Sequence, residues 1–596
     1  MNADKRGWGE AEAPRKRKLA PRSRWLLPEG DAGQAEGLAR ELGISRLAAR
    51  ILMRRGYQEA EPAREFLHPR LESLHAPELM KGVREAAERL RRAVAEKEKI
   101  LLYGDYDVDG TTSIVLLKTA LGLAGAEAEY HVPHRLKEGY GMRPEVIEEA
   151  ARTGVKLIIS VDTGIRAIEV VRYAAELGID VIVTDHHLPE QELPPALAVL
   201  NPNQPGCGYP EKNLCGAGVA FKLVQALLGA SELPAERVQR LTESFLKMVA
   251  IATVADVVPL TGENRVIVKH GLAGLSSTGN PGLRALLEVA GFQAGDRLNA
   301  HQVAFRIAPR MNAAGRMASA RQVIEMFLTR DAAEARRIAG ELQELNTDRQ
   351  QTEADMVRQI LEICEQEPVT DAMKSLVFAG EGWHRGVVGI VASRVVERFH
   401  RPAFVLGIDA ETGLAQGSGR SIPVFHLLEA LETMPEMFAK FGGHRQAAGL
   451  TMEAGRIEEF RRRFQEYADS RLSVEDLIPY MEIDAEASLG ELTDGVVEEV
   501  LGLGPFGYGN PAPVVAVRGV QLRDQPTLIK EKHLRFRVMQ NGRSLQMKAW
   551  NFAERAEEFE PGRSLDIAFR LEHDDYSAAR GYAPWQAVVK DVRAAE

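Results

Sequence analysis

Three aspartates occupy alternate positions after an apolar run in the stretch LLYGDYDVDG, residues 101–110. Crowded together, Asp105, Asp107 and Asp109 repel one another, and each raises the pKa of the others unless a positive charge lies among them. The stretch is therefore either a solvated acidic loop or a place where a cation binds. If the apolar run is a strand, the acids lie at its carboxyl end, where open α/β sheets build their binding sites.

Two known patterns share part of this stretch. An EF-hand loop also opens with alternate acids and a glycine, but its twelfth position needs a bidentate carboxylate. Counting from Asp105, that position is Leu116, so the EF-hand interpretation fails. The letters DVDGT at residues 107–111 also resemble a haloacid-dehalogenase-like phosphatase, in which one aspartate is the nucleophile. That interpretation needs a partnering lysine and a later acidic pair without histidines.

Later strand ends carry more side chains that bind metals. The run LIISVDTG ends at Asp162, and VIVTDHH ends at Asp185, His186 and His187. Parallel strands bring their carboxyl ends to one edge of a sheet, so we expect these side chains to converge. A fourth acid, Asp256, lies in the apolar stretch VAIATVADVVPL, which we expect to be helical. A buried carboxylate there needs a partner or a metal.

The types of donor indicate the metal and the chemistry. Carboxylates with one or two imidazoles and no thiolate suit Mn²⁺ or Mg²⁺ better than zinc. Two such ions, roughly 3.5–4 Å apart, activate water and clamp the attacking and leaving oxygens of a phosphoryl displacement. This chemistry requires no protein nucleophile, and we find no Ser-His-Asp or Cys-His arrangement in the sequence.

Strands and helices alternate around these residues. The runs KILLYGD, AEYHVP, VKLIISVD, DVIVTD and LAVLNPN read as strands, and the first is followed by a helix near residues 114–124. This rhythm predicts a parallel sheet with helices on both faces. We also expect helices over residues 31–67, buried helices at residues 216–228 and 241–258, and one long helix over 332–367. Short strands from about residue 477 predict a small β-barrel.

Composition limits the class of protein. The chain has 596 residues, 45% of them hydrophobic, so it is long enough for several domains. A net charge of −10 argues against a wholly basic nucleic-acid-binding protein but allows a local basic groove. The three cysteines form no CxxC pair, so we expect neither disulfides nor structural zinc, and a cytoplasmic setting. We expect no membrane span and no signal peptide, and the RKRK run at residues 15–18 predicts a basic tail.

The ordered motifs GDYDVDGTTS, SVDTG, TDHH and ATVADVVPL resemble those of the DHH phosphoesterase superfamily. Within it, RMNAAGRM and GWHRGVVGIVASR resemble the middle blocks of the RecJ family of single-strand-specific DNA exonucleases. FGGHRQAAG resembles the signature of its DHHA1 domain, and PFGYGNPAPV resembles the opening of its C-terminal oligonucleotide-binding (OB) barrel. The resemblance extends over nearly everything from Leu42 onward.

The resemblance implies an α/β fold in which a parallel-sheet DHH domain is joined by a long helix to a second α/β domain, DHHA1. A C-terminal β-barrel of the OB-fold type follows. The expected bounds are a basic, disordered tail over 1–30, a helical lead-in over 31–97, DHH over 98–275, a helical connector over 276–370, DHHA1 over 371–466 and the OB-fold over 467–596.

The resemblance also implies the roles of individual residues. The expected metal ligands are Asp107, Asp109, Asp162, His186 and Asp256, with Asp105 as an additional ligand. The catalytic residues are these five together with His187, which faces the phosphate. Tyr103 stands where many DHH proteins carry a ligating histidine, so one metal site is expected to be a ligand short.

Three blocks are expected to hold the nucleic acid. The substrate-binding residues implied are Arg310, Asn312, Arg316, Ser418, Arg420 and His444, of which Arg316, Ser418 and Arg420 would hold a 5′-terminal phosphate. Trp383 is open to two interpretations, stacking on a base or packing in the core. Arg535 and Arg537 alternate along a predicted strand of the barrel, which would put both on one face.

The implied function is a metal-dependent 5′-to-3′ exonuclease specific for single-stranded DNA, which releases 5′-mononucleotides in DNA repair and recombination. It would use two Mn²⁺ or Mg²⁺ ions, with a helicase and a single-strand-binding protein as candidate partners. One alternative is a non-catalytic single-strand-binding scaffold, against which the complete set of acids argues. Another is a DHH phosphodiesterase acting on short oligonucleotides or cyclic dinucleotides, which would have no use for a barrel or the GSGRS block.

Overall fold

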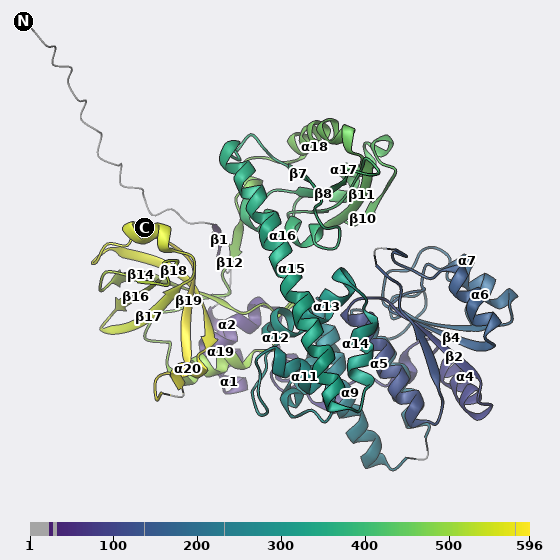
Figure 1. Cartoon of the computed structure of the whole chain (residues 1–596). Helices are drawn as coiled ribbons and strands as arrows, with labels where there is room; N and C mark the ends of the chain where they lie inside the picture. Colours follow the sequence, from purple (N-terminus) through teal and green to yellow (C-terminus); the bar gives the residue numbers. More distant parts are fainter. Residues whose placement is uncertain (1–22, 28–31, 136, 232, 579, 596) are drawn as a thin grey trace, which may run out of the picture. The chain divides into compact units, whose positions relative to one another are not determined.

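The computed structural model describes residues 23–27, 32–135, 137–231, 233–578 and 580–595, and the RKRK run lies outside them. The chain divides into two compact units. One contains residues 68–477 together with 504–511, and the other contains the residues before 68 together with 478–503 and 512–596. Figure 1 labels many of the elements of both.

A parallel sheet of five strands forms the centre of the first unit, as predicted, in the order β3-β2-β4-β5-β6. Its strands are β2 (Lys99–Tyr103), β3 (Ala128–His131), β4 (Val155–Val161), β5 (Asp180–Thr184) and β6 (Ala198–Leu200). Alternate residues of β2 enter different cores: Ile100 and Leu102 pack with one set of helices, and Leu101 and Tyr103 pack with another. A strand buried on both faces reads as an unbroken apolar run, which explains KILLY.

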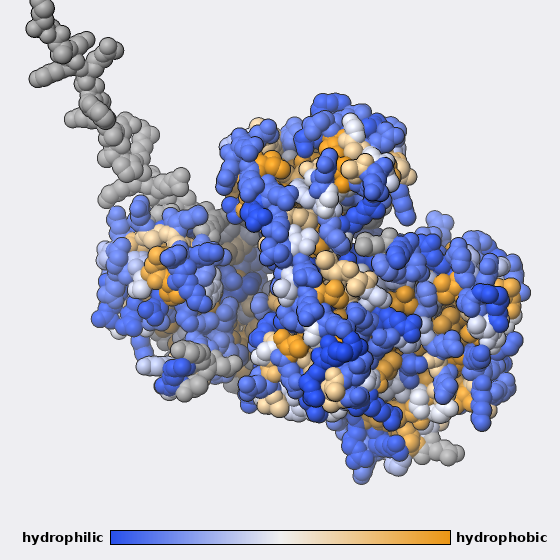
Figure 2. All heavy atoms as spheres, viewed as in Figure 1, coloured by the Kyte–Doolittle hydropathy of each residue, from blue (hydrophilic) through white to orange (hydrophobic). Residues whose placement is uncertain are grey.

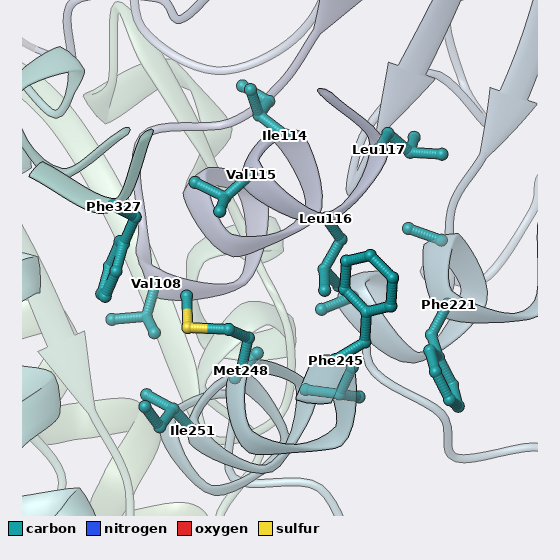
Figure 3. Close-up of a cluster of buried hydrophobic side chains, with 14 of the residues drawn as sticks. Val108, Ile114, Val115, Leu116, Leu117, Phe221, Phe245, Met248, Ile251 and Phe327 are labelled. Atoms are coloured by element: carbon teal, nitrogen blue, oxygen red, sulfur yellow. The ribbon is translucent and has the colours of Figure 1, made fainter. Parts of the chain in front are cut away.

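Helices cover both faces of this sheet. Helices α6 (Pro144–Arg152) and α7 (Ile168–Glu176) pack on one face, and α4 (Val83–Ala95), α5 (Val108–Leu123), α8 (Gly216–Gly229) and α9 (Ala235–Ala255) contribute to the core on the other. Figure 3 shows part of the second core, with Val108 and Leu116 of α5 near Phe221 of α8 and Phe245 and Met248 of α9. Helices α5 and α8 are apolar around most of their circumference, which is typical of helices inside a core.

Two helix boundaries differ from the prediction, and both involve the acidic residues. Helix α5 begins at Val108 rather than near residue 114, because Asp107 caps it by accepting from the Gly110 N–H at 3.0 Å. Helix α9 ends at Ala255, so Asp256 follows the helix instead of lying within it. The next residue, Val257, has a φ of 59°, which a helix cannot accommodate.

The predicted long helix is confirmed as α15 (Ala332–Gln366), 35 residues long and capped by Asp331. It leads from a helical region into a second α/β domain with sheet order β10-β11-β9-β8-β7, in which only β7 and β8 are parallel. The helical region contains α10 (Gly262–Ala273), α11 (Pro281–Val289), α12 (Ala300–Gln302), α13 (Ala308–Met317) and α14 (Arg321–Leu328). The second domain contains β7 (Leu376–Glu381), α16 (Val388–Phe399), β8 (Ala403–Asp409), β9 (Leu414–Arg420), α17 (Leu427–Glu432), β10 (Lys440–Gly443), β11 (Ala447–Glu453) and α18 (Ile457–Arg471).

The other unit contains the predicted β-barrel. Its seven-stranded sheet has the order β13-β14-β18-β19-β17-β16-β15, and an extra pairing of β14 with β16 partly closes it into a ring. On β16, exposed Arg535 and Arg537 alternate with buried Leu534 and Phe536, so the two arginines share one face as expected. The strands are β13 (Ala485–Glu486), β14 (Val514–Leu522), β15 (Thr527–Ile529), β16 (His533–Gln540), β17 (Arg543–Ala549), β18 (Ser564–His573) and β19 (Trp585–Ala594).

The remaining elements of this unit include the predicted N-terminal helices. These are α1 (Ala32–Leu42), α2 (Arg46–Arg54), α3 (Ala60–Leu67), α19 (Asp494–Gly502) and α20 (Asp575–Ala578), with a parallel pair formed by β1 (Arg24–Leu26) and β12 (Tyr480–Glu482). On the face of the molecule in Figure 2, hydrophilic side chains predominate and hydrophobic ones form small patches. No helix among the described residues combines the length and the apolar character that crossing a bilayer requires.

Candidate active site

Strand ends and one helix end bring the predicted metal ligands together. The Nε2 atom of His186, after β5, lies 3.2 Å from Asp162 Oδ1, after β4. The same nitrogen lies 3.7 Å from Asp256 Oδ2 and 3.9 Å from Asp109 Oδ2. Four separate segments therefore converge at the carboxyl edge of the parallel sheet. We call Asp105, Asp107, Asp109, Asp162, His186 and Asp256 the carboxylate cluster.

The cluster contains two groups of three donors, each with its ligand atoms within 4.8 Å of one another. The first is Asp105, Asp107 and Asp162, and the second is Asp109, His186 and Asp256. Asp162 and His186 also form a third such group with His187, so the two sets lie side by side.

Buried donor atoms without partners test whether a cation fits. Among the described residues, Asp105 Oδ1, Asp162 Oδ1, His186 Nε2 and Asp256 Oδ2 are buried and have no hydrogen-bond partner. Buried polar atoms rarely lack partners, and these four all belong to the two donor groups. Carboxylate oxygens with one imidazole match the preferences of Mn²⁺ and Mg²⁺.

Burial and mutual repulsion raise the pKa of these acids. Burial and the neighbouring Asp107 raise the pKa of Asp105 to about 8. Burial, with Asp109 and Asp107 nearby, raises the pKa of Asp256 to about 9. Asp162, buried among four other carboxylates, has a pKa well above its usual range. The repulsion expected from the sequence is therefore present, and a divalent cation would relieve it.

The first turn of α8 fixes one member of the cluster. The Gly216 N–H donates to Asp109 Oδ2 at 2.5 Å, and the Ala217 N–H donates to Asp109 Oδ1 at 2.8 Å. A Cβ atom on Gly216 would lie 2.7 Å from the Cβ of Asp162 and 2.9 Å from Asp109 Oδ2. Only glycine therefore allows the start of α8 to approach so closely. Our sequence analysis missed this role, although the run of small residues CGAG marks the place.

Tyr103 lies outside the metal donors. Its side chain is fully buried, and its hydroxyl donates to the carbonyl of Gly141 at 3.2 Å. We expected one metal site to lack a ligand at the position of Tyr103. Each of the two donor groups nevertheless has three donors, and in the first of them Asp105 lies beside Asp107 and Asp162.

A buried aspartate orients His187. Asp185 is fully buried, accepts from the Ile165 N–H at 3.0 Å, and lies 2.7 Å from His187 Nδ1. Burial disfavours charge on His187, but the bond to Asp185 outweighs it and raises the histidine pKa. The pKa of Asp185 is lowered, because the hydrogen bonds and charge of His187 outweigh the burial of the carboxylate. His187 Nδ1 is therefore the donor, and Asp185 is an orienting residue that the sequence analysis did not assign.

A cavity of about 720 Å³ opens beside His187. Tyr140, Met142, Ile165 and Arg166 contribute to its lining, and His444 of the second domain completes it. The Tyr140 hydroxyl donates to the Asp162 carbonyl at 3.3 Å, which ties the cavity wall to the metal ligands. The cavity thus offers apolar surface and a few polar groups next to the carboxylate cluster, which is typical of a ligand site.

Three arginines gather close to the cluster. Burial lowers the pKa of Arg316 to about 10, and Arg135 and Arg420 are among the cations that add to this shift, whereas Asp107 opposes it. Burial and Arg135 likewise lower the pKa of Arg420. Ser418 and Arg420 are two residues apart on β9, and both lie close to Gly389. A Cβ atom on Gly389 would be 3.4 Å from Ser418 Oγ and 3.1 Å from Arg420 Nη2. Half-buried like charges fit an anion, and we call Arg135, Arg316, Ser418 and Arg420 the arginine cluster.

Other predicted binding residues are placed differently. Arg310 lies on the same helix as Arg316 but donates to Gln343 at 2.7 Å and to backbone carbonyls. Asn312 lies one turn before Arg316 on α13, so both residues are on the same face of that helix. Trp383 is 7% exposed and donates to Gln359 at 2.8 Å, which makes it a core residue and removes the base-stacking interpretation. Our sequence analysis did not assign Arg135.

Three family descriptions match successive parts of the chain. The DHH family, N-terminal domain, matches residues 99–253, the DHHA1 domain matches 372–470, and the RecJ OB domain matches 483–591. The single-stranded-DNA-specific exonuclease RecJ of Bacillus subtilis is 40% identical over 97% of this chain and 72% of its own length. The chain belongs to the RecJ family. The Escherichia coli RecJ is 37% identical, over 86% of this chain and 90% of its own.

Solved RecJ structures share the fold. A crystal structure of Thermus thermophilus RecJ in complex with Mn²⁺ matches with a TM-score of 0.81 and 32% identity, over 96% of this chain and 80% of that one. A second, in complex with Mg²⁺, matches with a TM-score of 0.74 and 30% identity, over 96% and 79%. RecJ proteins of this fold thus bind the two ions that the donor set here favours.

The close approach at Gly216 predicts a loss of metal binding in Gly216→Ala. The added methyl group would separate α8 from Asp109 and Asp162, and displaced supporting groups typically weaken metal affinity about 10- to 100-fold. Gly229→Ala at the other end of α8 is the matched control, because its Cβ meets nothing within 4 Å. The measurement is calorimetric titration with Mn²⁺, and thermal unfolding verifies that both variants are folded. A folded Gly216→Ala protein that binds Mn²⁺ like the control would disprove this role.

The raised pKa values predict that metal binding releases protons. Below about pH 8 the metal-free protein keeps protons on Asp105 and Asp256, and a cation must displace them. Mn²⁺ affinity should therefore fall as the pH falls and rise between about pH 6.5 and 8.5. Titrations at one pH in two buffers of different ionisation enthalpy should differ in observed heat. Equal heats, with an affinity independent of pH, would contradict the prediction.

Proposed function

We propose that this chain is a metal-dependent 5′-to-3′ exonuclease that is specific for single-stranded DNA and releases 5′-mononucleotides. The observation that carries the proposal is the adjacency of two oppositely charged clusters. Arg135 lies 5.0 Å from the ring of Tyr106 and opposes the raised pKa of Asp105, while Arg316 interacts with Asp107. An anion held by the arginine cluster would therefore lie next to the metal donors.

This adjacency supports removal of one nucleotide at a time from a 5′ end. A terminal phosphate carries more charge than an internal one, so a buried arginine cluster favours the strand's end. With Arg135, Arg316, Ser418 and Arg420 on that phosphate, the next phosphodiester along the strand would reach the carboxylate cluster. The polarity then follows from which end carries the phosphate.

The residues of the chain divide the work of hydrolysis. Asp105, Asp107 and Asp162 would hold one ion, and Asp109, His186 and Asp256 the other; together the ions supply an activated water and neutralise charge on the phosphoryl oxygens. His187, whose pKa is raised by its bond to Asp185, would in its protonated form donate to a non-bridging oxygen of the scissile phosphate. His444 and the cavity beside it would bind the strand from the side of the second domain, and Asn312 would assist Arg316.

The wider role is also part of the proposal. The exposed Arg535 and Arg537 of the barrel would follow the backbone of the single strand. We propose the domain bounds 98–275, 276–370, 371–466 and 467–596, which the matches at 99–253, 372–470 and 483–591 support. We further propose a cytoplasmic role in DNA repair and recombination, in which a helicase supplies single strands and a single-strand-binding protein accompanies them.

Asp162→Asn should stop hydrolysis and leave strand binding intact. Asparagine is nearly isosteric and tolerates the left-handed backbone at this position, where φ is 56°, but it removes the charge between the two donor groups. The rate should fall at least about 100-fold, since lesser changes around metals already cost that much. The assay uses 3′-labelled single-stranded DNA with Mn²⁺, beside a matched duplex. Full activity in Asp162→Asn would exclude the carboxylate cluster as the site of reaction.

Arg420→Ala should reduce the preference for a 5′-phosphorylated end. Loss of one buried guanidinium should lower the ratio of kcat/KM between 5′-phosphate and 5′-hydroxyl strands by roughly tenfold, as expected for a charge-assisted bond. Arg462→Ala is the control, because Arg462 is an exposed residue paired with Glu466 on α18. An unchanged ratio in Arg420→Ala would place the terminal phosphate elsewhere.

A further inference from the structure

Residues 504–511, with the sequence GPFGYGNP, follow α19 and precede β14 along the chain. From the sequence this stretch resembles the opening of the barrel. In the structure, however, these eight residues belong to the unit that contains the carboxylate cluster, whereas both flanking elements belong to the other unit. We call residues 504–511 the returning loop.

The returning loop is bonded to the metal-binding domain through backbone groups. The Leu260 N–H donates to the Tyr508 carbonyl at 2.7 Å, and Arg265 Nη2 donates to the Gly504 carbonyl at 2.8 Å. Leu260 and Arg265 are 2% and 1% exposed, so the loop is attached to buried groups. A linker that merely passed over the surface would need no such attachment.

The returning loop is also bonded to itself. Gly507 and Asn510 exchange backbone hydrogen bonds of 2.9 and 3.2 Å, and the buried Asn510 side chain donates to the Pro505 carbonyl at 2.8 Å. These bonds fix the loop's own shape. The loop can therefore act as a rigid body against the residues that it contacts.

Two glycines allow the contact. Gly509 has a φ of 71°, and a Cβ there would lie 2.8 Å from the Cβ of Pro259 and 3.0 Å from its Cα. A Cβ on Gly507 would lie 2.6 Å from Leu260 Cδ1. The loop thus packs directly on Pro259 and Leu260. Side chains on Gly507 and Gly509 would prevent this close approach.

The segment under the loop carries a metal donor. Asp256 follows the last residue of α9, and Val257 has a φ of 59° although it is β-branched and 63% exposed. Such a conformation is strained and persists only where the surroundings impose it. Helix α9 holds the segment on one side. On the other side Val258 packs against the core, the Asn264 side chain donates to the Pro259 carbonyl at 3.2 Å, and Leu260 is bonded to the returning loop.

We propose that the returning loop is a positioning element of the metal centre. By holding Pro259 and Leu260, it maintains the strained turn at Val257 and so keeps Asp256 facing Asp109 and His186. The proposal rests on the proposed function only in taking Asp256 as a metal ligand. The returning loop is next to the nucleic-acid-binding barrel in sequence. Under this proposal it is part of the hydrolytic centre.

Gly509→Ala in the full chain tests the proposal, with Gly519→Ala as the matched control. Both glycines have left-handed backbones, with φ values of 71° and 63°, so alanine imposes a similar backbone cost at each. A Cβ on Gly519 meets nothing within 4 Å, whereas a Cβ on Gly509 meets Pro259. The pair therefore separates displacement of the loop from backbone strain.

Calorimetric titration with Mn²⁺ is the main measurement. We expect Gly509→Ala to weaken one of two binding events about tenfold and to leave the other unchanged, whereas Gly519→Ala matches the wild type. Tyr508→Ala, which keeps the carbonyl bonded to Leu260, should also bind Mn²⁺ like the wild type. In cleavage assays, Gly509→Ala should lower kcat with little change in KM for the strand.

Several results would overturn the proposal. These are unchanged Mn²⁺ affinities in folded Gly509→Ala, equal losses in Gly509→Ala and Gly519→Ala, or a loss in Tyr508→Ala that shows the ring to be responsible. If Gly509→Ala does not fold, Gly507→Ala replaces it, with a smaller loss expected because the Leu260 side chain can rotate. A wild-type protein that binds Mn²⁺ but does not cut DNA would refute the proposed function and leave the titrations interpretable.

Discussion

Repulsion among five buried or half-buried carboxylates is the constraint around which the metal-binding domain is organised. Burial raises the pKa of Asp105, Asp109, Asp162 and Asp256, and the neighbouring carboxylates, Asp107 among them, raise it further. A chain folding by itself would separate such charges. They stay together because one large apolar core contains residues of the parallel sheet, α8 and α9 and fixes these elements. The core provides the free energy that holds the acids in place, and the cations then relieve the repulsion.

Different local interactions position these acids, and two of the positions involve a strained backbone. Asp107 caps α5, and Asp109 accepts two N–H groups from the first turn of α8. Asp162 itself has a left-handed backbone, and the residue after Asp256 has one too. Left-handed conformations are uncommon outside glycine. Their occurrence at Asp162 and directly after Asp256 indicates that the placement of these two carboxylates comes at the expense of local backbone stability. The returning loop would then be one more device of this kind, which acts from outside the sheet.

The sequence predicted the parts of the site that depend on local pattern. Acids and histidines at the ends of apolar runs were predicted to converge, because a parallel sheet aligns the ends of its strands. What it missed depends on contacts between distant segments. No periodicity indicates that the N–H groups of Gly216 and Ala217 donate to Asp109. Nor does any pattern indicate that Arg135 joins Arg316 and Arg420, or that residues 504–511 return to the metal-binding domain. The start of α5 was misplaced because the acids looked like a loop, whereas Asp107 is a helix cap.

The two charged clusters explain each other better than either does alone. Half-buried Arg316 and Arg420, whose pKa values are lowered, are unfavourable by themselves, and so is a group of acids with raised pKa values. Salt bridges between them would neutralise both, yet Arg316 donates to the Gly386 carbonyl and the acids keep unpartnered oxygens among the described residues. The fold therefore keeps the opposite charges adjacent without pairing them. Under the proposed function, a strand with a phosphate at its end and metal ions on the next phosphate would satisfy both clusters at once. A scaffold that only bound single strands would have a use for the arginines but none for the acids.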